Sequence, residues 1–324
     1  MCTALSFTAK DHYFGRNLDL EFSYNEEIVI TPRNFPFDFK HLPSSKEHLA
    51  MIGVAAISKG YPLYFDATNE KGLSMAGLNF PDNAVYRAIM DDMNNVAPFE
   101  LIPWILSQCE TVKQAKILLE KLNLINLPFS PAYPLTPLHF MLCDRVESIV
   151  IEPMHDKIYV YENKTKVLTN NPPFPMQLQN LNNYMHLTCN PPANKFSKEL
   201  DLKPYSRGMG GLGLPGDLSS ASRFVKAVFV SQSALHEKTE SSNVGQFFHI
   251  LKSVEQTKGC VILEGGEAEF TAYSSCCNTD KGIFYYTTYQ NSQISSVRLY
   301  NENLDTEKLI SYPMISEQQI YKHN

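Results

Sequence analysis

The sequence predicts an α+β domain that spans residues 1–324. Strand-like segments lie near both ends of the chain, and helical segments form two blocks between them. This order favours packed layers in which the first and last strands meet, instead of a repeated βαβ unit. No low-complexity linker or fixed-period repeat divides the chain, so we expect one domain.

The expected strands combine alternating or β-branched apolar residues with Gly or Pro nearby. In the first of them, residues 2–8, a period of two places Cys2 on the same face as Ala4 and Ser6. The other expected strands are residues 27–31, 51–58, 62–65, 73–78, 138–142, 148–152, 157–161, 269–275, 283–289 and 294–300.

The expected helices are indicated by start signals and apolar spacing. Pro98 opens the first helix, and Thr111 is expected to begin a second one with Gln114 as its capping-box partner. In the second block, one helix should follow the glycine-rich segment 208–216, and another is expected at residues 244–254.

Composition argues against several classes of protein. The formal net charge is −6 and no basic tract stands out, which argues against a nucleic-acid partner. No stretch approaches the roughly 20 apolar residues of a membrane helix, and the N-terminus does not resemble a signal peptide. The seven cysteines include no C-x-x-C pair, so we expect reduced thiols, no metal site and a cytoplasmic location. A G-x-G-x-x-G match at residues 208–213 lacks a βαβ context, so we expect no cofactor.

Cys2 offers nucleophilic chemistry once Met1 is removed. It would then carry both a thiol and a free α-amine, whose unperturbed pKa of about 7.7–8.0 is close to neutrality. The amine can accept the thiol proton and later protonate a leaving amine, so no histidine is required. None of the nine histidines lies in a recognisable Cys-His motif. For an isolated cysteine, a buried side chain without a catalytic role is the competing and commoner interpretation.

The segment at residues 14–19 places an arginine and an aspartate shortly after this cysteine. A structural ion pair between Arg16 and Asp19 is the ordinary interpretation. Together with Cys2 they allow a sharper one, in which the carboxylate orients the α-amine and the guanidinium stabilises a thiolate.

Blocks along the whole chain resemble the choloylglycine hydrolase family, which contains bile salt hydrolases and penicillin V acylases. The similar blocks are residues 1–3, 14–19, 69–73, 76–80, 168–172, 214–217, 222–224, 273–276 and 285–289. They are collinear from the first residue to the last. The resemblance implies the four-layered αββα sandwich of N-terminal-nucleophile hydrolases, a homotetramer, and maturation that needs only removal of Met1.

The resemblance also implies a catalytic set: a nucleophile, two groups that position and tune it, two oxyanion-hole amides and a buried arginine. These are, in that order, Cys2, Arg16 with Asp19, Asn79 with Asn170, and Arg223. Side-chain amides suit this role because they aim donors at developing negative charge. Turn chemistry is the competing interpretation of the two asparagines.

The implied substrate is a glycine- or taurine-conjugated bile salt, hydrolysed through a Cys2 thioester. The residues expected around it are Leu18, Tyr24, Phe65, Leu78, Asn79, Leu135 and Arg207. Asn79 favours a bile salt hydrolase, because penicillin V acylases often have Tyr there. Arg207 can meet a sulfonate or carboxylate, although an exposed loop arginine without this role is equally compatible with the sequence.

Two other functions are compatible with the same residues. The first is penicillin V acylase or another N-acyl amidase that uses the same machinery. The second is a non-catalytic bile-salt or lipid-binding protein that retains the fold.

Overall fold

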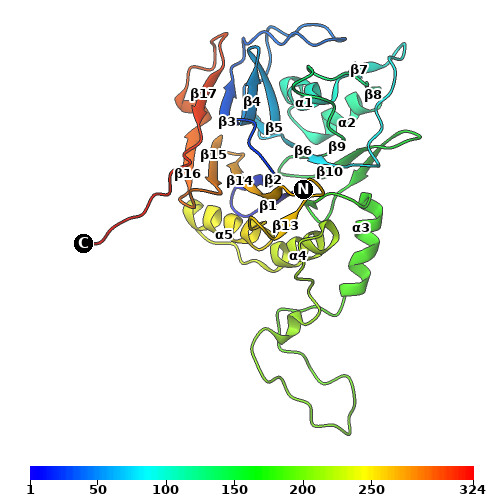
Figure 1. The fold of residues 1–324 in the computed structure, drawn as a ribbon, viewed down its shortest axis with the longest axis vertical. Coiled ribbons are helices and arrows are strands. Elements are labelled where there is room, and N and C mark those ends of the chain that lie inside the picture. Colours follow the sequence, from blue (N-terminus) through cyan, green and yellow to red (C-terminus); the bar gives the residue numbers. More distant parts are fainter.

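Two antiparallel sheets lie face to face between two layers of helices in the computed structural model, which describes residues 1–324 (Figure 1). The first sheet has the order β12 (Val167–Leu168), β1 (Cys2–Thr8), β2 (His12–Leu20), β14 (Ala268–Asn278), β15 (Ile283–Thr288) and β16 (Ser295–Arg298), with β13 (Val261–Ile262) paired to β14. The second has the order β11 (Ile158–Glu162), β10 (Ser148–Pro153), β9 (Leu138–Cys143), β6 (Ser74–Asn79), β5 (Tyr61–Asn69), β4 (Met51–Ser58), β3 (Glu27–Thr31) and β17 (Ile310–Pro313).

Helices cover the outer face of each sheet. The helices are α1 (Leu101–Gln108), α2 (Val112–Leu119), α3 (Phe174–Asn180), α4 (Ser220–Ser233) and α5 (Glu240–Lys252). The first two pack on the second sheet beside a small parallel pair, β7 (Asn94–Val96) and β8 (Leu122–Leu124). The last two pack on the first sheet (Figure 1). None of these helices combines the length and apolar character that a membrane span requires.

The first and last parts of the chain meet in the first sheet, as the order of elements predicts. β2 pairs with β1 on one side and with β14 on the other, which brings Asp19 opposite Thr271. The register shifts between Thr271 and Tyr273, next to this pair. Such irregularities re-aim side chains and are common beside active sites.

Alternation along β1 determines which side chains face the second sheet. Phe7 packs on Phe247 of α5 with 5.4 Å between ring centroids, and Thr3 bonds to Arg223 of α4. Thr3 and Phe7 therefore face the helices, and the alternate residues of the strand, starting with Cys2, face the space between the sheets. This places Cys2 at the edge of the sandwich, where its strand starts.

Most of the expected elements are present, with differences at their ends. Thr111 does cap α2, and its Oγ1 atom accepts the N–H of Gln114 at 3.2 Å, but the Gln114 side chain binds the N–H of Glu110 instead of closing the expected box. α5 begins at Glu240 because Thr239 caps it, earlier than expected. The strand expected at residues 294–300 ends at Arg298 in a 3₁₀ turn.

The pattern missed β2, α3 and β17, whose periodicity is interrupted by polar or proline residues. A long excursion without helices or strands of ordinary length connects α3 to α4 and projects from the body of the molecule (Figure 1). We refer to residues 185–218 as the projecting loop.

Candidate active site

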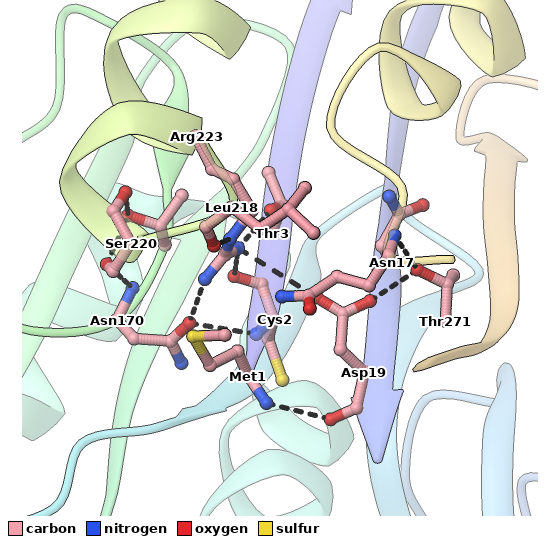
Figure 2. A network of polar contacts seen from close by, with 12 residues as sticks. Met1, Cys2, Thr3, Asn17, Asp19, Asn170, Leu218, Ser220, Arg223 and Thr271 are labelled. Carbon is pink, nitrogen blue, oxygen red and sulfur yellow. Dashed lines mark hydrogen bonds and ion pairs between the residues drawn. The ribbon is translucent and has the colours of Figure 1, made fainter. Parts of the chain in front are cut away.

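Cys2 is held at both of its main-chain polar groups (Figure 2). Its N–H donates to the Oδ1 atom of Asn170 at 2.8 Å, and its carbonyl oxygen accepts from Nη1 of Arg223 at 2.6 Å. The residue is only 3% exposed. Because both neighbours are fixed side chains, the position of the thiol is set before any substrate arrives.

Arg223 links the nucleophile to Asn170. Its Nη1 atom also donates to the Oγ1 atom of Thr3 at 2.6 Å, its Nη2 atom donates to Oδ1 of Asn170 at 2.7 Å, and Nε donates to the carbonyl of Leu218 at 3.0 Å. The side chain lies in the first turns of α4 and is buried. Burial lowers the pKa of this guanidinium, while the nearby Asp19 and Cys2 act in the opposite direction.

The amide of Asn170 has a fixed orientation. Its oxygen faces the donors of Cys2 and Arg223, and its Nδ2 atom donates to the main-chain oxygen of Asn79 at 2.7 Å. Its own N–H donates to the Oγ atom of Ser220 at 2.8 Å. The second Nδ2 hydrogen has no partner in the chain, so it is free to meet an oxyanion.

Asn79 departs in one respect from the expected pair of side-chain amides. The group that contacts Asn170 is its backbone carbonyl, and its side chain makes no hydrogen bond within the protein. This side chain instead lines the cavity described below, where it can approach a ligand.

Asp19 has one satisfied and one free carboxylate oxygen. Oδ1 accepts from the Oγ1 atom of Thr271 at 2.6 Å, while Oδ2 is buried without a hydrogen-bond partner and lies 3.9 Å from Nη1 of Arg223. An unsatisfied buried carboxylate oxygen is costly. A new donor, such as the α-amine that Cys2 gains when Met1 leaves, would remove this cost.

Arg16 does not form the ordinary ion pair with Asp19. Its Nη1 atom donates to the carbonyl oxygens of Phe65, at 2.9 Å, and Gly77, at 2.6 Å, while Nη2 is buried without a partner. Burial opposes the charge, but Cys2 and other acidic neighbours outweigh it, so the pKa of the guanidinium is raised. Arg16 is therefore a fixed positive charge near the thiol.

Met1 occupies the open side of Cys2. Its amino group donates to the main-chain oxygen of Asp19 at 2.9 Å and lies 2.7 Å from Oε2 of Glu269. Burial raises the pKa of Glu269, and the amino group of Met1 acts against this. Sequence reasoning missed Glu269, since nothing in its local sequence marks it as part of the site.

A largely apolar cavity opens beside Cys2. It is lined by 27 residues, 17 of them hydrophobic, and it includes Met1, Cys2, Arg16, Asp19 and Glu269. Five of the expected substrate contacts line it, namely Leu18, Tyr24, Phe65, Asn79 and Leu135. The proline-rich segment at residues 127–136 supplies further walls, among them Phe129 and Tyr133, which sequence reasoning did not single out.

Two expected contacts lie elsewhere, which corrects those two predictions. Leu78 is fully buried in the core, because Gly77 and Asn79 line the cavity and the residue between them points to the opposite face of the strand. Arg207 is exposed on the projecting loop and does not line the cavity. No group of three or more His, Cys, Asp or Glu side chains is arranged to hold a metal ion.

Two stacked sheets between helical layers, with a cysteine at the start of the first strand, have the layered fold expected of N-terminal-nucleophile hydrolases. Residues 2–312 match the linear amide C–N hydrolases of the choloylglycine hydrolase family, and the chain belongs to this family. It is 54% identical to the bile salt hydrolase/transferase of Lactiplantibacillus plantarum over 100% of both chains. It is 36% identical to the bile salt hydrolase/transferase of Clostridium perfringens over 96% of each.

Solved structures agree with the expected fold. A mutant of the conjugated bile acid hydrolase from Clostridium perfringens superposes with a TM-score of 0.94 at 34% identity, covering 100% of both chains. Penicillin V acylase from Agrobacterium tumefaciens gives a TM-score of 0.75 at 17% identity, covering 96% of this chain and 91% of that one. The predicted family and layered fold are therefore confirmed.

Proposed function

We propose that this chain hydrolyses the amide bond of glycine- or taurine-conjugated bile salts, with Cys2 as the nucleophile. The observation that carries the proposal is the position of Cys2, clamped between Asn170 and Arg223 at the wall of a mostly apolar cavity. Two relatives named bile salt hydrolase/transferase, which are 54% and 36% identical to the chain, support the substrate class.

Acylation begins when the α-amine of processed Cys2 takes the thiol proton. The sulfur then attacks the carbonyl carbon of the conjugate, while the free Nδ2–H of Asn170 stabilises the oxyanion and the Asn79 side chain adds a second donor. When the tetrahedral intermediate collapses, the α-ammonium protonates the leaving nitrogen and glycine or taurine departs.

In deacylation the protons move through the same α-amine in the opposite direction. The α-amine takes a proton from a water molecule, whose oxygen attacks the thioester carbon. The C–S bond then breaks, the bile acid leaves, and the sulfur regains its proton from the α-ammonium. The free Oδ2 atom of Asp19 is available to hold the α-amine, and the charge of Arg16 favours the thiolate in both half-reactions.

The steroid body would lie against the apolar wall of the cavity. Tyr24 packs on Phe65 with 5.8 Å between ring centroids, which gives this wall a fixed aromatic surface. Leu18 and Leu135 extend it, and Asn79 would approach the scissile amide. The acidic or sulfonate end of the conjugate would then point away from this apolar wall.

An amine-release assay on glycocholate, taurocholate and penicillin V tests the proposal, with the parent and Cys2→Ala chains compared after processing. Faster release of glycine or taurine than of the penicillin side chain, by the parent only, is the expected result. Preference for penicillin V would support the same mechanism but would favour the alternative function, a penicillin V acylase or another N-acyl amidase. Ligand binding that survives Cys2→Ala, with no turnover by the parent, would favour the binding-protein alternative.

Transfer of the acyl group is a second candidate activity. The relatives from Lactiplantibacillus plantarum and Clostridium perfringens are named hydrolase/transferases. A transferase would use the same Cys2 thioester and replace water by another acceptor. The contact of Glu269 with the amino group of Met1 supports this candidate, because the same carboxylate would be able to hold an amine acceptor beside Cys2.

A homotetramer in the cytoplasm is also part of the proposal. The projecting loop carries exposed apolar side chains that a second copy of the chain would cover: Met185, Phe196, Leu200, Leu202, Tyr205 and Leu212. Seven free thiols are compatible with a reducing compartment. Light scattering of the parent and of a Phe196→Ser/Tyr205→Ser variant tests the assembly, and an unchanged mass for the variant would count against this loop as the interface.

A further inference from the structure

The amino terminus of the unprocessed chain lies in a polar site beside the nucleophile. This amino group of Met1 is held by the main-chain oxygen of Asp19 and by Oε2 of Glu269. Glu269 is 6% exposed, and its other oxygen, Oε1, is buried without a partner. A buried carboxylate and a carbonyl oxygen that converge in this way form a receptor for a cation.

Removal of Met1 vacates this receptor without dismantling it. Asp19 lies opposite Thr271, two residues along β14 from Glu269, so the pairing of β2 with β14 keeps the two groups near one another, and Met1 takes no part in that ladder. The nitrogen of Cys2 is already engaged on another side, by Oδ1 of Asn170. Arg223 donates to Asn170, and Arg16 donates through Nη1 to backbone carbonyls, while Nη2 of Arg16 is buried without a partner.

A buried carboxylate that loses its counter-charge favours a replacement cation. The vacated position opens on the cavity that also contains Cys2, so a small molecule that enters the cavity can reach it. Removal of Met1 would thus leave an open ammonium position beside the sulfur that would carry an acyl group.

We propose that Glu269 and the main-chain oxygen of Asp19 form an acceptor subsite for primary amines, which directs the acyl group from Cys2 to an amine in competition with water. The proposal rests on the Cys2 thioester of the proposed function. The proposal adds a binding site for the amine acceptor and identifies Glu269 as the residue that takes a proton from this amine.

The transfer step balances with groups already present. The acceptor arrives as an ammonium ion and gives one proton to the Glu269 carboxylate. Its nitrogen then forms a C–N bond with the thioester carbon, the C–S bond breaks, and the second proton reaches the Cys2 sulfur through the α-amine. The products are the new amide, a free thiol and a protonated Glu269, and burial favours that neutral carboxyl.

L-Methioninamide is the appropriate probe because it reproduces the ammonium and carbonyl of the bound Met1. Processed enzyme is supplied with taurocholate and increasing methioninamide, and the ratio of N-cholyl-methioninamide to free cholate is measured. Both products come from the same acyl-enzyme, so the ratio does not depend on how fast that intermediate forms. The neutral hydroxy analogue of methioninamide serves as an uncharged nucleophile.

We expect the ratio to saturate with methioninamide, and Glu269→Gln to lower it about tenfold and remove the saturation. Glu264→Gln, which changes an exposed carboxylate near the same strand, is the matched control and should leave the ratio unchanged. The hydroxy analogue should give little transfer with either chain.

Two results of the comparison between variants or between acceptors would overturn the subsite. One is an equal ratio for Glu269→Gln and parent at every acceptor concentration. The other is equal transfer to the amine and to its hydroxy analogue. Absence of both products from processed parent enzyme would instead overturn the Cys2 thioester itself, and the subsite with it. Hydrolysis without any transfer would leave the proposed hydrolysis standing and contradict the subsite.

Discussion

The guanidinium of Arg223 donates a hydrogen bond of 2.7 Å to the Oδ1 atom of Asn170, the same oxygen that accepts the N–H of Cys2 (Figure 2). Because two donors face this oxygen, the amide cannot flip without losing both bonds. Its Nδ2 group is thereby aimed at the substrate side. Arg223 thus acts on the reaction through the orientation of Asn170 and Cys2, and it is a positioning residue.

Replacing Arg223 by leucine should lower kcat by about 10²–10³-fold and destabilise the fold by about 3–5 kcal/mol, because several buried acceptors lose their donor. Amine release and urea unfolding measure the two effects. Lys226→Leu, on the same helix but partly exposed, should change neither quantity appreciably. A less than threefold change in kcat for Arg223→Leu would contradict this role.

Asn170→Ala should lower kcat by about 10²–10³-fold and leave KM nearly unchanged, since the Nδ2–H interaction forms with the oxyanion and not with the ground-state amide. Steady-state kinetics on glycocholate separate the two constants. A rise in KM with an unchanged kcat would show that Asn170 binds substrate uniformly, and the oxyanion assignment would fail.

Blocking the amino terminus of Cys2 should abolish turnover. An acylated nitrogen cannot serve as the base, and Met1 or any preceding residue occupies the cavity beside the thiol. A chain with a cleavable extension that ends directly before Cys2 should be inactive, and protease treatment should restore amide hydrolysis. Full activity of the uncut chain would exclude the α-amine as the base.

His12 should make the fold sensitive to acid. Burial, with a smaller contribution from Lys166, lowers the pKa of its imidazole to about 3. The unfolded histidine titrates near pH 6.5, so the stabilising contribution is complete above about pH 6.5 and is lost as the pH falls toward 3.

Replacement of His12 by glutamine should therefore reduce the pH dependence of the unfolding free energy in this window by up to about 1.4 kcal/mol per pH unit. Urea titrations at several pH values measure the slope. The exposed His323→Gln variant is the control, and an identical slope for His12→Gln and parent would contradict the prediction.

The sequence was most informative where chemistry is local. Cys2, Arg16 and Asp19 lie within one β-hairpin, so their proximity follows from a short segment. The resemblance supplied Asn170 and Arg223, which arrive from a loop and a helix far along the chain. Neither source marked Glu269, because its approach to the first residues depends on the register between β2 and β14.

The two incorrect contact predictions, for Leu78 and Arg207, each have a structural cause. Leu78 was expected at the substrate because it adjoins Asn79, but neighbours in a strand point to opposite faces. Arg207 was expected there because its loop resembles one associated with taurine conjugates and an arginine can meet a sulfonate, but the projecting loop places it away from the cavity. Both depend on the path of the backbone, which residue type alone does not specify.

Trapping the acyl-enzyme tests the central claim most directly. Processed enzyme is mixed briefly with glycocholate, quenched in acid, digested and analysed by mass spectrometry. We predict a cholyl group on the peptide that begins with Cys2, absent from the Cys2→Ala chain and removed on longer incubation. Turnover of glycocholate by the Cys2→Ala chain, or a cholyl group on another residue, would contradict the account.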